Sequence, residues 1–125
     1  MALESQEQEQ EHDEKADPTV TNPTLYRTVF ENDRVRVLEY RDHPGDVTTP
    51  HRHPDSVMVT LSGFSRRISS GGREVDVQLS TGEVRWVGAQ EHVGANTGGT
   101  DTHVFFIELK EGGSTMDGSL GPSRV

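Results

Sequence analysis

The stretch that decides the fold runs from Gly45 to Gly63 and reads GDVTTPHRHPDSVMVTLSG. It contains an H-x-H pair, His51 and His53, followed by a run rich in β-branched residues that ends at a glycine. Because successive side chains of a strand point to opposite faces, two histidines spaced by two lie on one face, within reach of a single metal ion. By itself the pair also fits two exposed histidines at a strand edge, so a metal site requires a further ligand.

The flanking sequence shows a two-residue alternation of apolar side chains, broken repeatedly by glycine turns. No segment carries a convincing helical stripe, and Ser70-Gly71-Gly72-Arg73 forms a good hairpin connection. Strands are predicted over residues 25–30, 35–40, 57–61, 66–69, 74–79, 84–87 and 103–109. Many short strands at even spacing predict an all-β antiparallel sandwich or barrel with little or no helix.

A third histidine, His92, follows the strand predicted over residues 84–87. Its distance in sequence from His53 suffices for the chain to return through strand, hairpin and strand to the same end of a barrel. With His51 it would complete a facial set of three imidazoles that leaves coordination positions open. We therefore take His51, His53 and His92 as candidate metal ligands.

The remaining histidines have other interpretations. His12 lies in an acidic segment and His43 in a loop between two aspartates, and both are predicted to be solvated. His103 shares its strand parity with Phe105 and Ile107, so it is either a cavity residue near the metal, a fourth ligand, or a core histidine.

The quoted stretch resembles the first motif of the cupin superfamily, in which a glycine and five residues precede H-x-H. The run from Gly82 to Asn96, GEVRWVGAQEHVGAN, is similar to the second motif, with its glycine, its histidine at His92 and its final asparagine. The resemblance covers residues 24–110. It implies a double-stranded β-helix, the jelly-roll barrel of cupins, with a metal on the three histidines and a homodimer formed through the sheets.

The sequence departs from the first motif where that motif normally supplies a glutamate ligand. Val57 and Met58 stand three or four residues after the second histidine, and neither binds a hard divalent cation. Ser56 is a candidate for the place of the glutamate. Asp55 offers a nearby carboxylate, which is either a turn residue after proline or a substitute ligand.

The three-histidine set resembles that of cupins that cleave β-diketones or oxidise thiols with ferrous iron. Neutral imidazoles leave the full charge on the metal, which favours an anionic substrate such as an enolate. We expect an Fe(II)-dependent dioxygenase-type oxidoreductase acting on a small molecule, although zinc, nickel, manganese or copper fit the same ligands. The alternatives are a non-catalytic metal-anchored binding or sensing module, and a metal-dependent isomerase or lyase.

Two further expectations concern the surroundings of the metal. Tyr26, Tyr40, Arg36 and Arg66 are candidates for substrate contacts, and a buried arginine would require an anionic partner. Since a protonated imidazole cannot bind a metal, we expect metal binding to weaken as the pH falls through the ordinary titration range of histidine.

Composition bounds the rest of the chain, which has 125 residues, no cysteine and a net charge of −9. Residues 1–22 hold seven acids and one lysine and are predicted to be a disordered acidic tail. Residues 112–125 are predicted to be a flexible Gly/Ser-rich tail. The residues between them, 23–111, are predicted to form one cupin domain. The acidic balance argues against nucleic-acid and anionic-membrane partners. No apolar run reaches the length of a membrane span, and without a secretory signal the cytoplasm is the default expectation.

Overall fold

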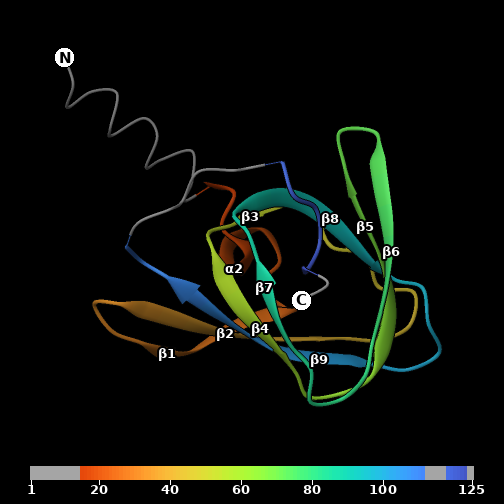
Figure 1. Cartoon of the computed structure of the whole chain (residues 1–125), viewed down its shortest axis with the longest axis horizontal. Helices are drawn as coiled ribbons and strands as arrows, with labels where there is room; N and C mark the ends of the chain where they lie inside the picture. The colour runs from red at the N-terminus through yellow and green to blue at the C-terminus, as the bar shows by residue number, and fades with distance from the viewer. Residues whose placement is uncertain (1–14, 112–117, 124–125) are drawn as a thin grey trace.

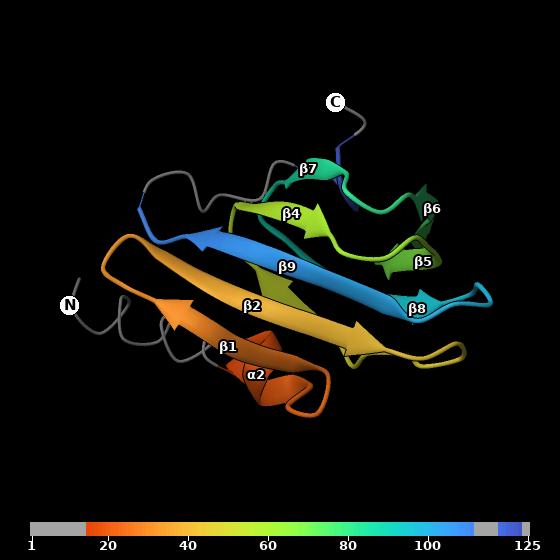
Figure 2. The same ribbon diagram turned by 90° about the horizontal axis from the view of Figure 1, so that it is seen from below.

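The computed structural model describes residues 15–111 and 118–123, which form two antiparallel sheets packed face to face (Figure 1, Figure 2). The five-stranded sheet has the order β1-β2-β9-β4-β7, and the four-stranded sheet has the order β3-β8-β5-β6. The strands are β1 (Tyr26–Glu31), β2 (Val35–Asp42), β3 (His51–His53), β4 (Ser56–Thr60), β5 (Phe64–Ser70), β6 (Arg73–Leu79), β7 (Val84–Val87), β8 (Gln90–Asn96) and β9 (Thr102–Leu109). The prediction of an all-β antiparallel fold is confirmed.

The core lies between the two sheets and is built by the alternation seen in the sequence. In β4 the buried positions are Ser56, Met58 and Thr60, and in β9 every second residue is buried from Thr102 onward. The buried hydrophobic cluster comprises Tyr26, Leu38, Tyr40, Met58, Phe64, Leu79, Val87, Val104 and Phe106. Aromatic side chains from both sheets therefore fill much of the space between the sheets.

Strand β8 was not predicted from the sequence. Its buried positions are Gln90, His92, Gly94 and Asn96, so the face that points into the barrel carries polar groups and a glycine. An inward face without large apolar side chains lacks the alternation by which a half-buried strand is recognised. The sequence pattern does not predict this strand, because its inward positions carry polar residues that belong to the candidate site.

Residues just before residue 23 form a short helix that contacts the barrel. Helix α2 (Pro18–Thr21) is capped by Asp17, whose side chain accepts a hydrogen bond from the Thr19 backbone. Asp17 also pairs with Arg36 at 2.7 Å, and Asn22 is buried. These contacts are polar, so they leave no hydrophobic pattern in the sequence. Residues 1–14 of the predicted tail lie outside the described residues.

Residues 118–123, near the C-terminus, also lie against the barrel. The Gly121 backbone N–H donates to Oε1 of Gln90 at 2.7 Å, and that of Ser123 donates to the Trp86 carbonyl at 2.7 Å. Residues 112–117 and 124–125 of the predicted flexible tail lie outside the described residues. Within the described part of the chain, no helix has the length and apolar character needed to cross a membrane.

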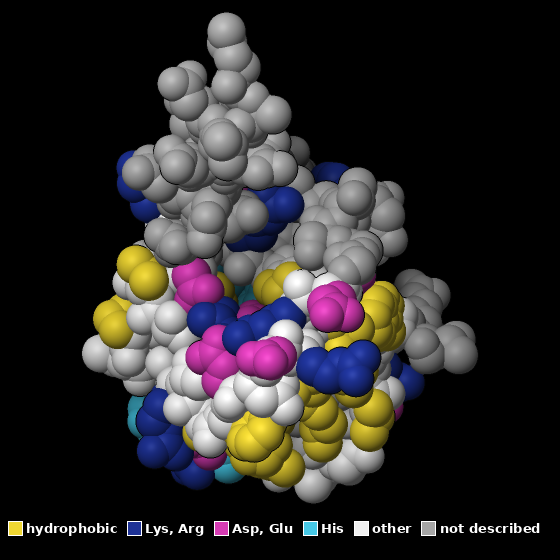
Figure 3. Space-filling model, turned by 90° about the vertical axis from the view of Figure 1, so that its left-hand side faces the viewer, with side chains coloured by type: hydrophobic (Ala, Val, Ile, Leu, Met, Phe, Trp, Pro, Cys, Tyr) yellow, Lys and Arg dark blue, Asp and Glu magenta, His cyan; other side chains and the backbone are white. Residues whose placement is uncertain are grey.

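The outer face of the five-stranded sheet is rich in apolar side chains. Val57 and Val59 of β4 pair with Trp86 and Val84 of β7, and the outward residues of β9 include Ile107. Val84 and Trp86 are 59% and 41% exposed. Figure 3, which views the molecule from one side, shows hydrophobic side chains below and beside a band of charged ones.

Candidate metal site

The three candidate ligands come together inside the barrel. Strand β3 pairs with β8 so that His51 lies opposite His92, and His53 follows on the same buried face of β3. One ring nitrogen of each histidine lies within 4.8 Å of the others, and all three side chains are buried. The structure therefore contains a three-histidine group that could hold a metal ion, as in cupins.

Each imidazole turns its Nδ1 atom toward an acceptor. The Nδ1–H of His51 donates to the Thr49 carbonyl, and that of His92 donates to Oε1 of Gln90, each at 2.8 Å. Nδ1 of His53 faces Oε2 of Glu108 at 3.7 Å. A histidine that carries its proton on Nδ1 keeps the lone pair of Nε2 available, so all three Nε2 atoms are potential donors to a metal.

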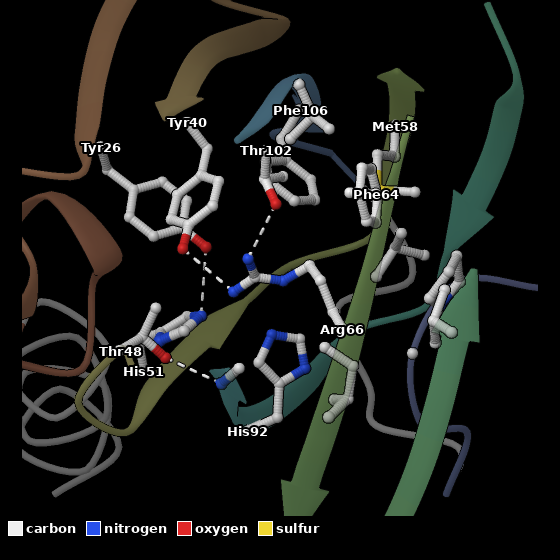
Figure 4. Close-up of a pocket in the computed structure, with 17 residues that line it drawn as sticks. Tyr26, Tyr40, Thr48, His51, Met58, Phe64, Arg66, His92, Thr102 and Phe106 are labelled. Atoms are coloured by element: carbon white, nitrogen blue, oxygen red, sulfur yellow. Dashed lines mark hydrogen bonds between the residues drawn. The ribbon is translucent and has the colours of Figure 1, made fainter. Parts of the chain in front are cut away.

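The hydroxyl of Tyr26 lies beside two of these nitrogens, 3.3 Å from Nε2 of His51 (Figure 4) and 3.3 Å from Nε2 of His53. Burial raises the pKa of Tyr26 well above its ordinary value, so the metal-free hydroxyl keeps its proton. That single proton cannot satisfy two acceptor nitrogens fully. A cation bound by the Nε2 atoms would remove this deficit, so the donor set fits a metal.

Behind His53 lies a buried carboxylate that the sequence analysis missed. Oε1 of Glu108 accepts a hydrogen bond from Nε of Arg36 at 2.7 Å, whereas Oε2 of Glu108, Nδ1 of His53 and Oγ of Ser56 have no hydrogen-bond partner among the described residues. Ser56 lies opposite Glu108 in the β4–β9 pair. A carboxylate that faces the distal nitrogen of a ligating histidine orients the ring and raises its basicity.

The position of Glu108 corrects the interpretation of β9. His103 was considered as a cavity residue or a fourth ligand, but its side chain lies on the outer face, where Nε2 is 2.8 Å from Oε2 of Glu39. The inward residues include Thr102, Phe106 and Glu108. Because β9 carries apolar residues on both faces, its sequence does not indicate which face is inside.

Two other expectations have clear outcomes. Oδ1 of Asp55 accepts a hydrogen bond from the Ala89 backbone at 2.8 Å, so this carboxylate has a turn role and does not belong to the histidine group. His43 is largely exposed and pairs with Asp101, as predicted for a solvated residue. His12 lies outside the described residues.

The environment disfavours the protonated form of two of the clustered histidines. Burial, together with the neighbouring His53, lowers the pKa of His51 to about 3. Burial, with His53 and His51 nearby, holds the pKa of His92 well below its usual value. Protons therefore compete less strongly for these two residues than for an ordinary histidine.

A small cavity adjoins the histidines, with about 50 Å³ open to the centres of water molecules. Its walls include Met58, Phe64 and Phe106, and the guanidinium of Arg66 reaches into it from β5, between Tyr40 and His92 (Figure 4). This volume accommodates roughly three to five water molecules. The enclosed space therefore suits a small substrate, or the reacting end of a larger one.

Arg66 is held by a buried ion pair with Asp42, as a buried arginine requires. It also donates to the Tyr40 hydroxyl at 3.0 Å and to Oγ1 of Thr102 at 3.1 Å. Asn96, the last residue of the second motif, donates to Asp42 at 3.0 Å. Burial alone would raise the pKa of Asp42, but the Tyr40 hydrogen bond and the charge of Arg66 outweigh it and lower the pKa.

Solved structures share this fold. A cupin domain from Bordetella pertussis Tohama I is 29% identical to this chain, with a TM-score of 0.65 over 70% of this chain and 93% of that one. The chain folds as a cupin. No protein-family model matches it, and the search of curated proteins finds no match.

More distant cupins share the same fold. A cupin superfamily protein from Desulfitobacterium hafniense DCB-2 is 21% identical, with a TM-score of 0.53 over 70% of this chain and 77% of that chain. The polyketide cyclase RemF from Streptomyces resistomycificus is also 21% identical, with a TM-score of 0.52 over 69% and 64% of the two chains. At this level of identity the likeness concerns the fold and not the reaction.

Proposed function

We propose that this cupin is a metal-dependent, dioxygenase-type oxidoreductase that holds Fe(II) through Nε2 of His51, His53 and His92. Its substrate would be a small anionic or enolisable molecule. The observation that carries the proposal is the donor set itself: three buried imidazoles, two of which line a cavity, with no Asp or Glu joining them among the described residues. Imidazole suits iron, zinc, copper and nickel alike, so the reaction class rests on a ligand set that lacks a carboxylate and leaves coordination positions open.

A bound ferrous ion would supply a Lewis-acidic, redox-active centre with coordination positions that the protein leaves open. The chain's own residues would prepare the site. Thr49, Gln90 and Glu108 would hold the three rings in the orientation that presents Nε2. The apolar walls would exclude water and so strengthen electrostatic interactions within the cavity.

Arg66 would orient the substrate. Its charge is balanced by Asp42, so the pair adds little net attraction, but its donors lie at a defined place on the cavity wall. An anionic group near Arg66 could therefore be held in one orientation while the metal provides the attraction. The small cavity volume limits the part of the substrate that enters.

The test is oxygen uptake by Fe(II)-loaded protein with a panel of diketones, enols and thiols, using His92→Ala under the same loading as the control. We expect one compound class to drive uptake in the wild type and no uptake in the variant. Binding of a panel compound without turnover would instead indicate a binding or sensing module. Conversion without oxygen consumption would indicate an isomerase or lyase, and both results would contradict the proposed oxidoreductase.

A further inference from the structure

We propose that Tyr26 supplies a fourth, oxygen donor to the metal. The inference rests on the proposed metal site. Tyr26 comes from β1, far in sequence from both cupin motifs, and its side chain is buried among His51, His53 and Phe106. Its hydroxyl is 3.3 Å from Nε2 of His51 and 3.3 Å from Nε2 of His53.

These two distances match the spacing of neighbouring donors in a tetrahedral metal site and slightly exceed the spacing in an octahedral one. With metal–nitrogen bonds of about 2.0–2.1 Å, neighbouring donors lie about 3.3–3.4 Å apart in a tetrahedral site and about 2.8–3.0 Å apart in an octahedral one. The Tyr26 oxygen therefore stands where a donor adjacent to both histidines would stand. In a six-coordinate ion, the four donors would leave two positions for other ligands.

The other oxygen donors near the histidines do not face the shared Nε2 atoms. Asp55 accepts the Ala89 backbone hydrogen bond, and the inward position of β4 that follows Ser56 is Met58. Glu108 faces Nδ1 of His53, on the side of the ring away from the shared Nε2 atoms. Tyr26 is the residue whose oxygen contacts the Nε2 atoms themselves.

Coordination by Tyr26 would exchange its O–H bond for a bond between oxygen and the metal, and the oxidation states of tyrosine and metal would not change. The O–H bond of Tyr26 breaks, its proton leaves to solvent, and the phenolate oxygen bonds to the metal. A bound cation reverses the effect that burial alone has on a nearby acid, because it stabilises the anionic form. The phenolate would also compensate part of the buried dication's charge, which three neutral imidazoles do not.

The experiment uses Cu²⁺ as the probe, since it binds such sites most tightly and copper phenolates absorb in the visible. Wild-type protein titrated with Cu²⁺ should develop a phenolate-to-copper charge-transfer band, with resonance Raman enhancement of tyrosinate modes. Tyr26→Phe should lose the band and bind Zn²⁺ more weakly, by at least the roughly 10-fold that outer-shell changes already cause. Tyr40→Phe, which removes the neighbouring hydroxyl on Arg66 and Asp42, should keep the band.

The outcomes separate the two proposals. Stoichiometric metal without a tyrosinate signal in the wild type would overturn the role of Tyr26 and leave the three-histidine site standing. A band that persists in Tyr26→Phe would assign it to another tyrosine and overturn the inference as well. A wild-type protein that takes up no metal would overturn the proposed function together with the inference. If Tyr26→Phe does not fold, a band that Tyr40→Phe retains is still assigned to Tyr26, because the chain has two tyrosines.

Discussion

His51 lies directly opposite His92 in the antiparallel β3–β8 pair, so one register position brings together two candidate ligands from distant parts of the chain. A slip of one residue in this pair would turn His92 to the outer face, because side chains alternate along a strand. Register in this sheet therefore controls the geometry of the site. The predictions below test the site, its supports and its surroundings.

Metal content should depend on the three clustered histidines. Replacing His51, His53 or His92 singly by alanine should strip most bound metal, because the two remaining imidazoles hold a first-row cation less tightly. His43→Ala and His103→Ala should retain metal, since both side chains lie away from the group. Elemental analysis after loading and dialysis measures this, and full metal content in His92→Ala would contradict the three-histidine site.

Metal should also stabilise the fold in the wild type. The gain in the free energy of unfolding is about 2.7 kcal/mol when free metal is one hundred times its dissociation constant. Thermal melts with and without chelator measure it, and the three alanine variants should show little of this gain. A melting temperature that does not respond to metal in the wild type would argue against a site in the folded state.

Glu108→Gln should weaken metal binding without dismantling the ligand set. Glutamine keeps the size of the side chain but cannot place a negative charge behind His53, so Zn²⁺ affinity should fall by about 10- to 100-fold. The matched control is Glu39→Gln, which affects a carboxylate on the outer face of the same sheet that pairs with His103. Competition with a chelator measures the Zn²⁺ affinity of both variants. Equal affinities would show that Glu108 does not support metal binding and that its role is the ion pair with Arg36.

The metal-free protein should lose stability as the pH falls below about 6.5. Folding depresses the pKa of His51 and His92, so below 6.5 the unfolded chain binds protons that the folded chain does not, and each such histidine destabilises the folded state. Between pH 7.5 and 5.5 His51 should cost on the order of 1 kcal/mol, and His92 should add to the loss in the same direction. Urea unfolding at the two pH values measures this, and His92→Gln should show a smaller loss than the wild type. An unchanged unfolding energy would mean that the histidines titrate normally.

The segment around helix α2 should contribute to stability, contrary to the expectation from sequence that residues 1–22 have nothing to bury. A chain that begins at residue 23 loses the Asp17–Arg36 ion pair and the hydrogen bond from the Thr49 backbone to Asn22. Compared with a chain that begins at residue 15, its melting temperature should be lower by about 4–8 °C, which corresponds to about 1 kcal/mol in a domain of this size. Equal melting temperatures would show that these contacts add nothing in solution.

We also propose that two copies associate through the outer face of the five-stranded sheet, because large apolar patches are unusual on monomers. Light scattering at micromolar concentration should give twice the chain mass of 13.8 kDa. Val84→Glu should give the mass of one chain. The control is Val47→Glu, at a residue that is equally exposed but bridged to Ala95 beside the other sheet. A wild-type protein with the mass of one chain would contradict the homodimer.

Sequence alone determined the features of this protein that depend on local geometry. The shared face of His51 and His53 follows from strand alternation, the antiparallel fold follows from short alternating runs between glycines, and the absence of a glutamate ligand follows from Val57 and Met58. None of these requires knowledge of which segments meet in space.

Tertiary structure alone decided the rest of the site. Whether His92 joins the pair depends on the β3–β8 register, and Tyr26 and Glu108 reach the histidines because β1 and β9 belong to the facing sheet. The inward face of β9 could not be chosen from its sequence, since both faces are apolar and the buried charge of Glu108 is satisfied by Arg36. The physical reason is common to all three residues: a strand's sequence specifies its alternation, but packing against distant strands specifies which face is buried and what it meets.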